Sequence, residues 1–197
     1  MKAVLLSIRP EWCKLIWAGM KTVEVRKTKP EGLKPPFKCY IYCTLAGSDS
    51  LFMDVLNRDV AAWNRDGWPE KKGLVIGEFT CDGIENVVFP YPAYQNKLDP
   101  KLILKSGMSY IQLHRYASSG KTRDDLFFWH ISDLKIYNQP KDIMCFHRAV
   151  EENELWCKKC AIGKKKDVHC AFCYGLDGLR LRRPPQSWCY VEELSSE

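Results

Sequence analysis

The chain has 197 residues, of which 46% are hydrophobic and 27% are charged. This composition is ordinary for a soluble globular protein and excludes a wholly disordered or collagen-like chain. No apolar run approaches the roughly 20 residues that a transmembrane helix needs, and the apolar start is far too short for a signal peptide. We therefore expect a cytoplasmic protein without a membrane partner, most simply one domain over residues 1–197.

The net charge of +6 is concentrated in one stretch of the sequence. Residues 157–183 contain eight Lys or Arg residues and two Asp residues, so they account for the whole excess and the rest of the chain is neutral. A local basic patch of this kind suggests a polyanionic partner. The alternative is a solvated lysine-rich loop whose charge only keeps the protein soluble.

The first 27 residues predict a strand, a helix and a second strand. Lys2–Ile8 has the mostly apolar character of a buried strand. Pro10 suits the first turn of a helix, and Gly19 is the expected stop after it. Residues 22–27 then alternate between apolar and polar side chains. In a strand, the polar members of this run share one face: Thr22, Glu24 and Arg26.

The middle of the chain predicts two strands with a helix between them. Residues 39–45 alternate again and predict a strand. Residues 50–64 carry apolar side chains at helical spacing, which predicts an amphipathic helix. Residues 74–88 read as one further strand, which contains Glu78 among apolar neighbours.

The last part of the chain begins with residues 89–108, which are rich in proline and carry no assignment. Ser109 and Gln112 have the spacing of a capping box and predict a short helix. Residues 125–137 read as one long strand, and residues 186–192 as a final strand.

Strands outnumber helices in this assignment, and no regular β-α-β order appears. These two features favour an α+β fold with a compact mixed sheet or small barrel and peripheral helices over a doubly wound sheet.

Four of the ten cysteines form a C-x2-C-x9-C-x2-C pattern: Cys157, Cys160, Cys170 and Cys173. In a cytosolic chain, paired C-x2-C motifs indicate metal ligands rather than disulfides or free thiols, which are the alternatives. Two such turns supply the four thiolates of a closed tetrahedral Zn²⁺ site, with His169 as an alternative ligand beside Cys170. We expect a structural zinc ion that orders a small, basic, zinc-knuckle-like insert at about residues 151–183.

A second group of polar residues consists of Lys21, Glu24, Arg26 and Glu78. Glu24 and Arg26 lie two residues apart on one predicted strand, while a carboxylate such as Glu78 is costly in an apolar strand unless it is paired. One interpretation is an ion-pair network at the edge of the core. The other is a ligand pocket in which Lys and Arg hold an anion or a base carbonyl and a carboxylate contacts amino groups or moves a proton.

Aromatic residues offer a further candidate contact. Trp188 and Tyr190 alternate onto one face of the last predicted strand, where they could stack on a base. Packing in the core is the alternative, and it is the more common role for such side chains.

Five phrases in family order resemble the ASCH domain of the PUA-like superfamily and together extend over residues 3–191. The most specific is GMKTVEVR at residues 19–26, which matches G-x-K-T-x-E-x-R. The others are LLSIRP at 5–10, VIGEF at 75–79, WHISDLKIY at 129–137 and RPPQSWCY at 183–190. The last phrase is similar to a subgroup common in bacteria and their phages, whose members carry a small insert where the cysteine cluster falls.

The ASCH resemblance implies a PUA-like mixed β-barrel with helices around it and a cleft that faces RNA or a nucleotide. PUA-like domains typically bind RNA, and some relatives bind modified bases. Carried over to this sequence, the ligand-binding residues would be Ser7, Arg9, Lys21, Glu24, Arg26 and Glu78.

One enzymatic branch of the family resembles an amidohydrolase that acts on N4-acylated cytidine. It uses a Lys, a Thr three residues later as the nucleophile, and a Glu on a later strand. Lys21 and Glu78 match the catalytic Lys and Glu, but the nucleophile position is occupied by Glu24. A glutamate cannot replace a hydroxyl nucleophile without a change of mechanism, so water or Thr22 would have to attack.

Three hypotheses follow. The leading one is an RNA- or nucleotide-binding protein with a Lys/Glu/Arg cleft and a basic, zinc-stabilised insert. The second is a hydrolase for a modified nucleoside such as N4-acylcytidine, or an RNA-processing enzyme, with Lys21 and Glu78 as the acid–base pair. The third is an adaptor that binds protein partners through the insert.

Overall fold

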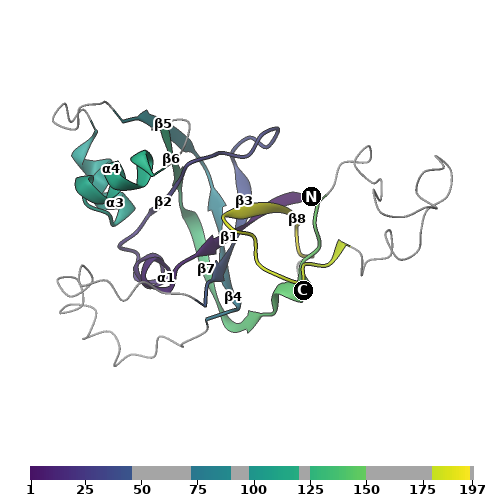
Figure 1. Ribbon diagram of the computed structural model, residues 1–197. Coiled ribbons are helices and arrows are strands. Elements are labelled where there is room, and N and C mark those ends of the chain that lie inside the picture. Colours follow the sequence, from purple (N-terminus) through teal and green to yellow (C-terminus); the bar gives the residue numbers. More distant parts are fainter. Residues whose placement is uncertain (46–71, 90–97, 120–124, 150–178, 196–197) are drawn as a thin grey trace, which may run out of the picture.

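The computed structural model describes residues 1–45, 72–89, 98–119, 125–149 and 179–195, and its larger sheet has five strands (Figure 1). The strand order is β7-β4-β3-β1-β8, in which β1 and β3 run parallel and the other neighbours antiparallel. The five strands have these bounds: β1 Lys2–Ile8, β3 Phe37–Cys43, β4 Val75–Cys81, β7 Ser132–Lys141 and β8 Trp188–Glu192.

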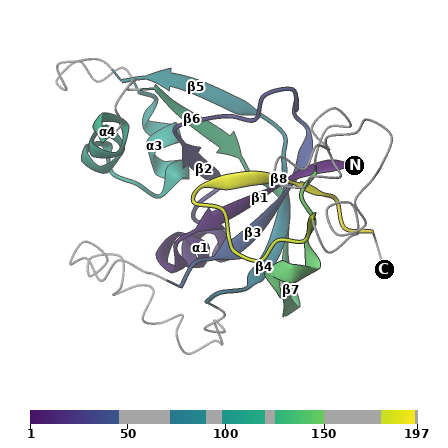
Figure 2. The same ribbon diagram turned by 45° about the vertical axis from the view of Figure 1, so that its right-hand side comes forward.

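The smaller sheet is antiparallel and has the order β2-β6-β5. Figures 1 and 2 show two helices, α3 and α4, beside this sheet, and α1 next to the larger one. The elements have these bounds: β2 Val23–Arg26, β5 Ile84–Val88, β6 Asp125–His130, α1 Pro10–Trp17, α3 Pro100–Ser106, α4 Tyr110–Ser118 and a 3₁₀ turn at Ile143–Cys145.

The larger sheet has a buried cluster on each face, because successive side chains of a strand point to opposite sides. On β1, Leu6 and Ile8 pack with α1 and with Trp129 of the smaller sheet. Ala3 and Leu5 face the other way and pack in a cluster with Ile143 of the 3₁₀ turn and Leu181. The first of these clusters therefore joins the two sheets.

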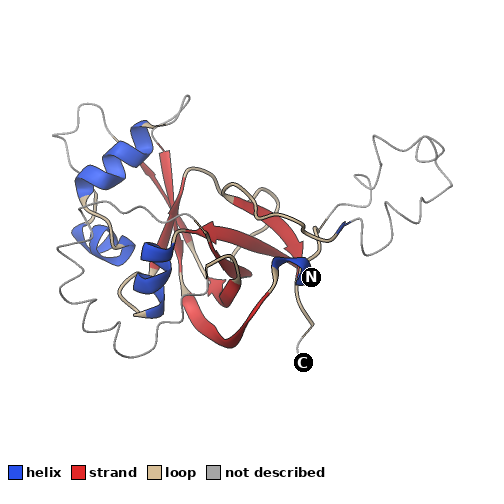
Figure 3. Cartoon of the chain, turned by 60° about the horizontal axis from the view of Figure 1, so that its bottom comes forward, coloured by secondary structure: helices blue, strands red, loops and turns tan. Residues whose placement is uncertain are grey.

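Helices α3 and α4 cover one face of the smaller sheet (Figure 3). Val23 and Val25 of β2 pack against Leu102 of α3 and Leu113 of α4 in a third buried cluster. Because side chains alternate along β2, Glu24 and Arg26 are turned to the opposite face, toward the larger sheet.

Most predicted elements of the first and last parts of the chain are confirmed. The strand at Lys2–Ile8, the helix from Pro10 and the final strand are present, with β2 spanning Val23–Arg26. The capping box is also present: Ser109 Oγ accepts from the backbone N–H of Gln112, whose side chain accepts from the backbone N–H of Ser109.

Two long predicted strands are each two strands in different sheets. Residues 74–88 divide at Gly83 into β4 of the larger sheet and β5 of the smaller one, and residues 125–137 divide at Ile131 into β6 and β7. The two crossings lie side by side, since the backbone N–H of His130 donates to the carbonyl of Gly83 at 2.9 Å. A hydrophobic pattern cannot reveal a change of sheet when both strands are partly buried.

The predicted α+β class is confirmed, but the strands of the described residues form two sheets rather than one closed barrel. Helix α3 was not predicted, and the predicted helix at 50–64 lies outside the described residues, as does most of the insert at 151–183. None of the helices in the described part of the chain has the length and apolar character needed to cross a bilayer.

Candidate functional site

Three charged side chains predicted to share a site lie together and are buried. Glu24 Oε2 is 3.3 Å from Lys21 Nζ, and Glu24 Oε1 is 3.0 Å from Arg26 Nη2. Only 2% of Lys21, 5% of Glu24 and 6% of Arg26 is exposed. We call Lys21, Glu24 and Arg26 the buried ion cluster. Its carboxylate is shared between two cations, which is the arrangement that makes burial of such groups tolerable.

Arg26 connects the two sheets through its guanidinium group. Its Nη2 donates to the carbonyl of Ser7 on β1 at 2.9 Å. Its Nη1 lies 3.2 Å from both the carbonyl and the hydroxyl of Ser187, the residue before β8. The planar fork of arginine suits such multiple contacts, so Arg26 holds β2 against the larger sheet at this point.

Lys21 is held by the C-terminal end of α3. Its Nζ donates to the carbonyl of Ser106 at 2.7 Å and lies 5.4 Å from the centre of the Trp12 ring. A cation at this end of a helix is favoured by the helix dipole. Burial lowers the pKa of Lys21 below its ordinary value of 10.5, while the charge of Glu24 and its hydrogen bond act in the opposite direction.

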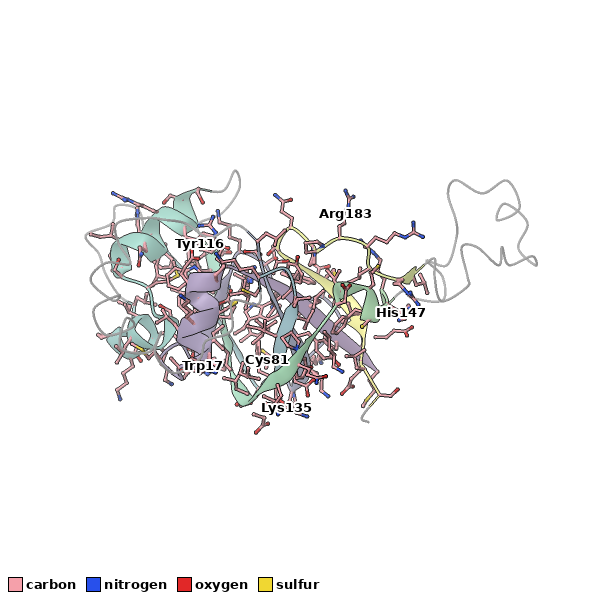
Figure 4. All side chains as sticks on the ribbon, turned by 90° about the horizontal axis from the view of Figure 1, so that it is seen from below. Trp17, Cys81, Tyr116, Lys135, His147 and Arg183 are labelled. Carbon is pink, nitrogen blue, oxygen red and sulfur yellow. The ribbon has the colours of Figure 1, made fainter. Side chains whose placement is uncertain are left out.

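The buried ion cluster lines a cleft of about 800 Å³. The walls come from the start of α1, from β2 and the residues after it, from α4 and from the segment before β8. Ser7 and Arg9 also line this cleft, so five of the six residues expected from the ASCH resemblance lie together. Figure 4 labels Tyr116 of α4, a further residue of the lining, near one end of α1.

Cationic side chains exceed carboxylates in the cleft. Five cations and two carboxylates line it: Arg9, Lys21, Arg26, Lys27, Arg115, Glu11 and Glu24. Arg9 and Arg115 are exposed, and Arg9 Nη1 is 4.0 Å from Glu11 Oε1. The cleft therefore favours a ligand with negative charge.

Glu78 does not share this cleft, and the expected Lys21–Glu78 pair is not formed. The Glu78 carboxylate accepts a hydrogen bond from the Tyr137 hydroxyl, and its Oε1 is 3.7 Å from Lys38 Nζ. Phe79, its neighbour on β4, packs in the cluster that joins the two sheets. Strand alternation turns Glu78 to the opposite face, which the sequence-based prediction did not take into account.

Trp188 does not itself line the cleft, although it contacts Thr28, a residue of the lining. Its indole N–H donates to Thr28 Oγ1 at 2.9 Å, and its ring packs against Trp129 and Tyr190 at centroid distances of 6.0 and 5.3 Å. The described contacts are those of a packing residue, the alternative considered for it from sequence. Its predicted role in base stacking stays a prediction.

Thr22, the alternative nucleophile, does not line the cleft in the described structure. Its backbone is fixed on both sides, because its N–H donates to Lys105 and its carbonyl accepts from Ile131. Of the two nucleophiles expected from the sequence, Thr22 is therefore not placed in the cleft, which leaves water.

The predicted zinc ligands Cys157, Cys160, Cys170 and Cys173 lie outside the described residues. Among the residues that the structure does describe, no group of three or more His, Cys, Asp or Glu side chains is placed to hold a metal ion. Zinc binding by the cysteine cluster stays a prediction from the sequence.

Two aromatic residues of the lining, Trp12 and Tyr116, were not predicted as site residues. Trp12 shares a helical face with Leu15 and Ile16, so its spacing predicts a core position. Tyr116 lies near the end of the capping-box helix, and no motif singles it out. Their place in the cleft depends on how α1 and α4 pack, for which the local sequence carries no signal.

A scan against protein-family models and a search of curated proteins find no match. A search of solved structures finds the crystal structure of ASCH from Zymomonas mobilis, with a TM-score of 0.46 and 16% identity over 97% of this chain and 88% of that one. A tyrosine-to-phenylalanine variant of the same protein matches with a TM-score of 0.45 and 17% identity, over 98% of this chain and 92% of that one.

Proposed function

We propose that the protein binds a nucleotide, either free or as part of an RNA strand, in the cleft that contains the buried ion cluster. The observation that carries this proposal is a buried Lys21–Glu24–Arg26 group in a cleft whose lining has an excess of cations. Ligand sites commonly combine a concave space with a few convergent polar groups and perturbed pKa values, as this cleft does.

The size of the cleft agrees with such a ligand. Its volume of about 800 Å³ falls within the usual range of roughly 300–1,000 Å³ for small-molecule and cofactor sites. That space accommodates one nucleotide rather than a folded duplex, so we expect an RNA strand to place one unpaired residue in it.

The aromatic side chains of the cleft supply surfaces for a base. Trp12 and Tyr116 come from different helices and are both half-buried. Stacking on an aromatic side chain contributes about 1–3 kcal/mol per base and tolerates any base, because every base has a π face. Lys27, whose Nζ is 5.0 Å from the Tyr116 ring, adds a cation beside it.

A pair of variants of α4 tests this proposal. Tyr116 and Tyr110 are both half-buried tyrosines that pack against the cluster under α4, but only Tyr116 lines the cleft. We expect Tyr116→Ala to weaken binding of fluorescent mononucleotides and a short unpaired RNA by about 5- to 100-fold. Tyr110→Ala is the matched control and should bind like the wild type. Equal binding by all three proteins would contradict the proposal.

A hydrolase is the second candidate, because Lys21 combines a lowered pKa with a neighbouring carboxylate in the cleft. Such a lysine is suited to accept a proton from water. Incubation with a mixture of modified nucleosides, including N4-acetylcytidine, followed by mass spectrometry tests this activity. Product formed by the wild type and not by Lys21→Ala would favour the hydrolase. The absence of product from both would leave only the binding function.

We also propose that the four paired cysteines hold one structural zinc ion, as their spacing predicts. Metal analysis of the purified protein should give about one zinc per chain. A Cys160→Ser/Cys173→Ser variant should lose it, whereas Cys145→Ser, which changes an exposed cysteine outside the pattern, should keep it. The protein adaptor hypothesis depends on the same insert and stays a prediction.

A further inference from the structure

The buried ion cluster carries more positive than negative charge. Lys21 and Arg26 share the single carboxylate of Glu24, and all three side chains are at most 6% exposed. Glu11 is the other carboxylate of the cleft lining. It is paired with the exposed Arg9 instead, whose Nη1 is 4.0 Å from Glu11 Oε1. Burial of a charge without a full set of partners is unfavourable, so the inner part of the cleft is suited to an added anion.

The hydrogen bonds of Arg26 point to the same conclusion. A guanidinium has five N–H donors, four on its Nη atoms and one on Nε. The Nη atoms contact Ser7, Ser187 and Glu24. The Nε atom is buried and has no acceptor among the described residues. A buried charged donor without an acceptor is rare in native proteins and calls for an explanation, such as a ligand that completes it.

Lys21 has a donor left as well. Its ammonium group has three N–H donors. Two of them are used by the carbonyl of Ser106 and by Glu24, which leaves one on a side chain that lines the cleft. Two cationic side chains, each with one spare donor, thus flank the same carboxylate.

We propose that the inner end of the cleft is an oxyanion subsite in which Arg26 and Lys21 bind a terminal phosphate of the ligand. This inference rests on the proposed function and adds the orientation of the nucleotide to it: phosphate inward, base outward between Trp12 and Tyr116. Oxyanions are the natural acceptors for arginine and lysine donors, and such charge-assisted bonds are the strong ones.

The subsite is better suited to a terminal phosphate of the ligand than to an internal phosphate of RNA. A phosphate monoester is attached to the nucleotide on one side only, so it can enter a recess end-on with three free oxygens. An internal phosphate of RNA is a diester with a nucleotide on each side, which keeps it at the mouth beside Arg9 and Arg115. The ligand is therefore a nucleoside monophosphate or an RNA whose end carries a phosphate.

Arginine side-chain NMR tests the subsite directly. Inorganic phosphate is added to the wild-type protein, with sodium chloride at equal ionic strength as the control, and the Nε–H signals of the arginines are followed. The Arg26 signal is identified by its loss in Arg26→Lys. We expect phosphate, but not chloride, to shift this signal in a saturable way. An Arg26 signal that does not move with phosphate overturns the subsite.

A second test compares different ligands on the wild-type protein. It needs no variant, so it remains valid if Arg26→Lys fails to fold. Each nucleoside is compared with its 5′- and 3′-monophosphates, and a short RNA with a terminal hydroxyl is compared with the same RNA carrying a terminal phosphate. We expect at least one terminal phosphate to strengthen binding about tenfold or more. The gain in affinity from the phosphate is then compared between free nucleotides and RNA ends. The larger gain shows which of these two ligands supplies the phosphate to the subsite.

These experiments separate the subsite from the proposed function. Binding that Tyr116→Ala weakens, but that a terminal phosphate does not strengthen, refutes the subsite and keeps the nucleotide cleft. A phosphate shift at Arg26 without binding of any nucleoside, nucleotide or RNA keeps the subsite and refutes the nucleotide cleft.

Discussion

Glu24 decides the electrostatic state of the cleft. It is the only carboxylate that contacts both Lys21 and Arg26 among the described residues, and its removal would leave two cations in a buried place. The loss of one partner from a buried ion pair is far more destabilising than the loss of an exposed pair, because the remaining charge cannot be solvated.

We predict that Glu24→Gln lowers the free energy of unfolding by about 3–5 kcal/mol. The control is Glu85→Gln, since Glu85 is 54% exposed in its pair with His130 and should contribute less than about 1 kcal/mol. Urea denaturation of both variants measures the difference. Removal of one cation as well, in Lys21→Met/Glu24→Gln, should restore part of the loss. Similar losses for Glu24→Gln and Glu85→Gln would show that the cluster is well solvated.

The lowered pKa of Lys21 predicts a pH dependence of stability. The unfolded chain keeps this proton up to about pH 10.5, whereas the folded protein releases it at a lower pH. Between these two values the unfolded state binds more protons, so the contribution of Lys21 to stability rises with pH. Each unit of lowering adds about 1.4 kcal/mol across this window.

The measurement is the free energy of unfolding of the wild type relative to Lys21→Met between neutral pH and pH 10.5. This difference should move in favour of the wild type as pH rises, while the difference for the exposed Lys101→Met should stay constant. A constant difference for Lys21 would mean that its folded pKa is ordinary.

Sequence reasoning located charged residues of the cleft better than its aromatic ones. Glu24 and Arg26 follow from strand alternation, and the G-x-K-T-x-E-x-R phrase adds Lys21. Glu78 was assigned to the same site because of its chemistry, although Phe79 beside it faces the first core cluster. Trp12 packs against the first core cluster and also lines the cleft, and a helical face that packs on the core has the same spacing as one that borders a cleft.

At the scale of elements, α3 positions the buried ion cluster although the sequence did not predict this helix. Its signals are local: the Asp99 side chain caps its first turn, Pro100 begins it, and Gly107 ends it with a positive φ of 68°. They lie in a stretch whose other prolines and polar residues indicate a loop. The Ser106 carbonyl at the end of this helix fixes Lys21, so the turn at Gly107 has a direct effect on the cleft.

We predict that Gly107→Ala destabilises the protein more than Gly32→Ala. Both glycines have a positive φ, so both variants carry a backbone cost of about 1–2 kcal/mol. At Gly107 the new Cβ would also lie 3.0 Å from Leu15 Cδ1 and 3.6 Å from Lys21 Cβ, whereas at Gly32 it meets no atom within 4 Å. Chemical denaturation should show about 1 kcal/mol of additional loss at position 107. Equal losses would mean that Leu15 moves aside freely.

The strands show which feature of the fold the sequence pattern does not predict. Residues 74–88 and 125–137 were each read as one strand, and the structure divides both between the two sheets. Just after the second division Asp133 has a positive φ of 48°, a left-handed conformation that no common sequence motif predicts here. The types of the elements were therefore predictable from alternation, whereas their distribution over two sheets depends on contacts between residues far apart in sequence.

At the scale of the whole molecule, the described residues on the two sides of positions 150–178 lie next to each other. The backbone N–H of Arg148 donates to the carbonyl of Leu179 at 2.8 Å, and His147 pairs with Arg180. The described residues before and after this segment are thus hydrogen-bonded to each other. Changes within the insert can therefore be made without cutting a strand of either sheet.

We predict that the lysines of the insert determine the salt dependence of RNA binding. The test variant replaces five of them with Gln: Lys158, Lys159, Lys164, Lys165 and Lys166. The slope of log K against log salt concentration should become shallower by about 0.7 for each lost phosphate contact with single-stranded RNA. Mononucleotide binding is the control and should not change. An unchanged slope would show that the insert does not hold the RNA backbone.

The segment between the insert and the cleft has a consequence for RNA length. The described chain resumes at Leu179, within the last few residues of the predicted insert, is anchored where Leu181 N–H donates to the carbonyl of Phe146, and reaches the cleft at Gln186. Eight residues span at most about 28 Å when fully extended. An RNA strand held both in the cleft and by the insert lysines would be bound bivalently, with a high effective concentration of the second contact. The affinity for RNA should then rise abruptly, through avidity, at the shortest RNA length that reaches both the cleft and the insert.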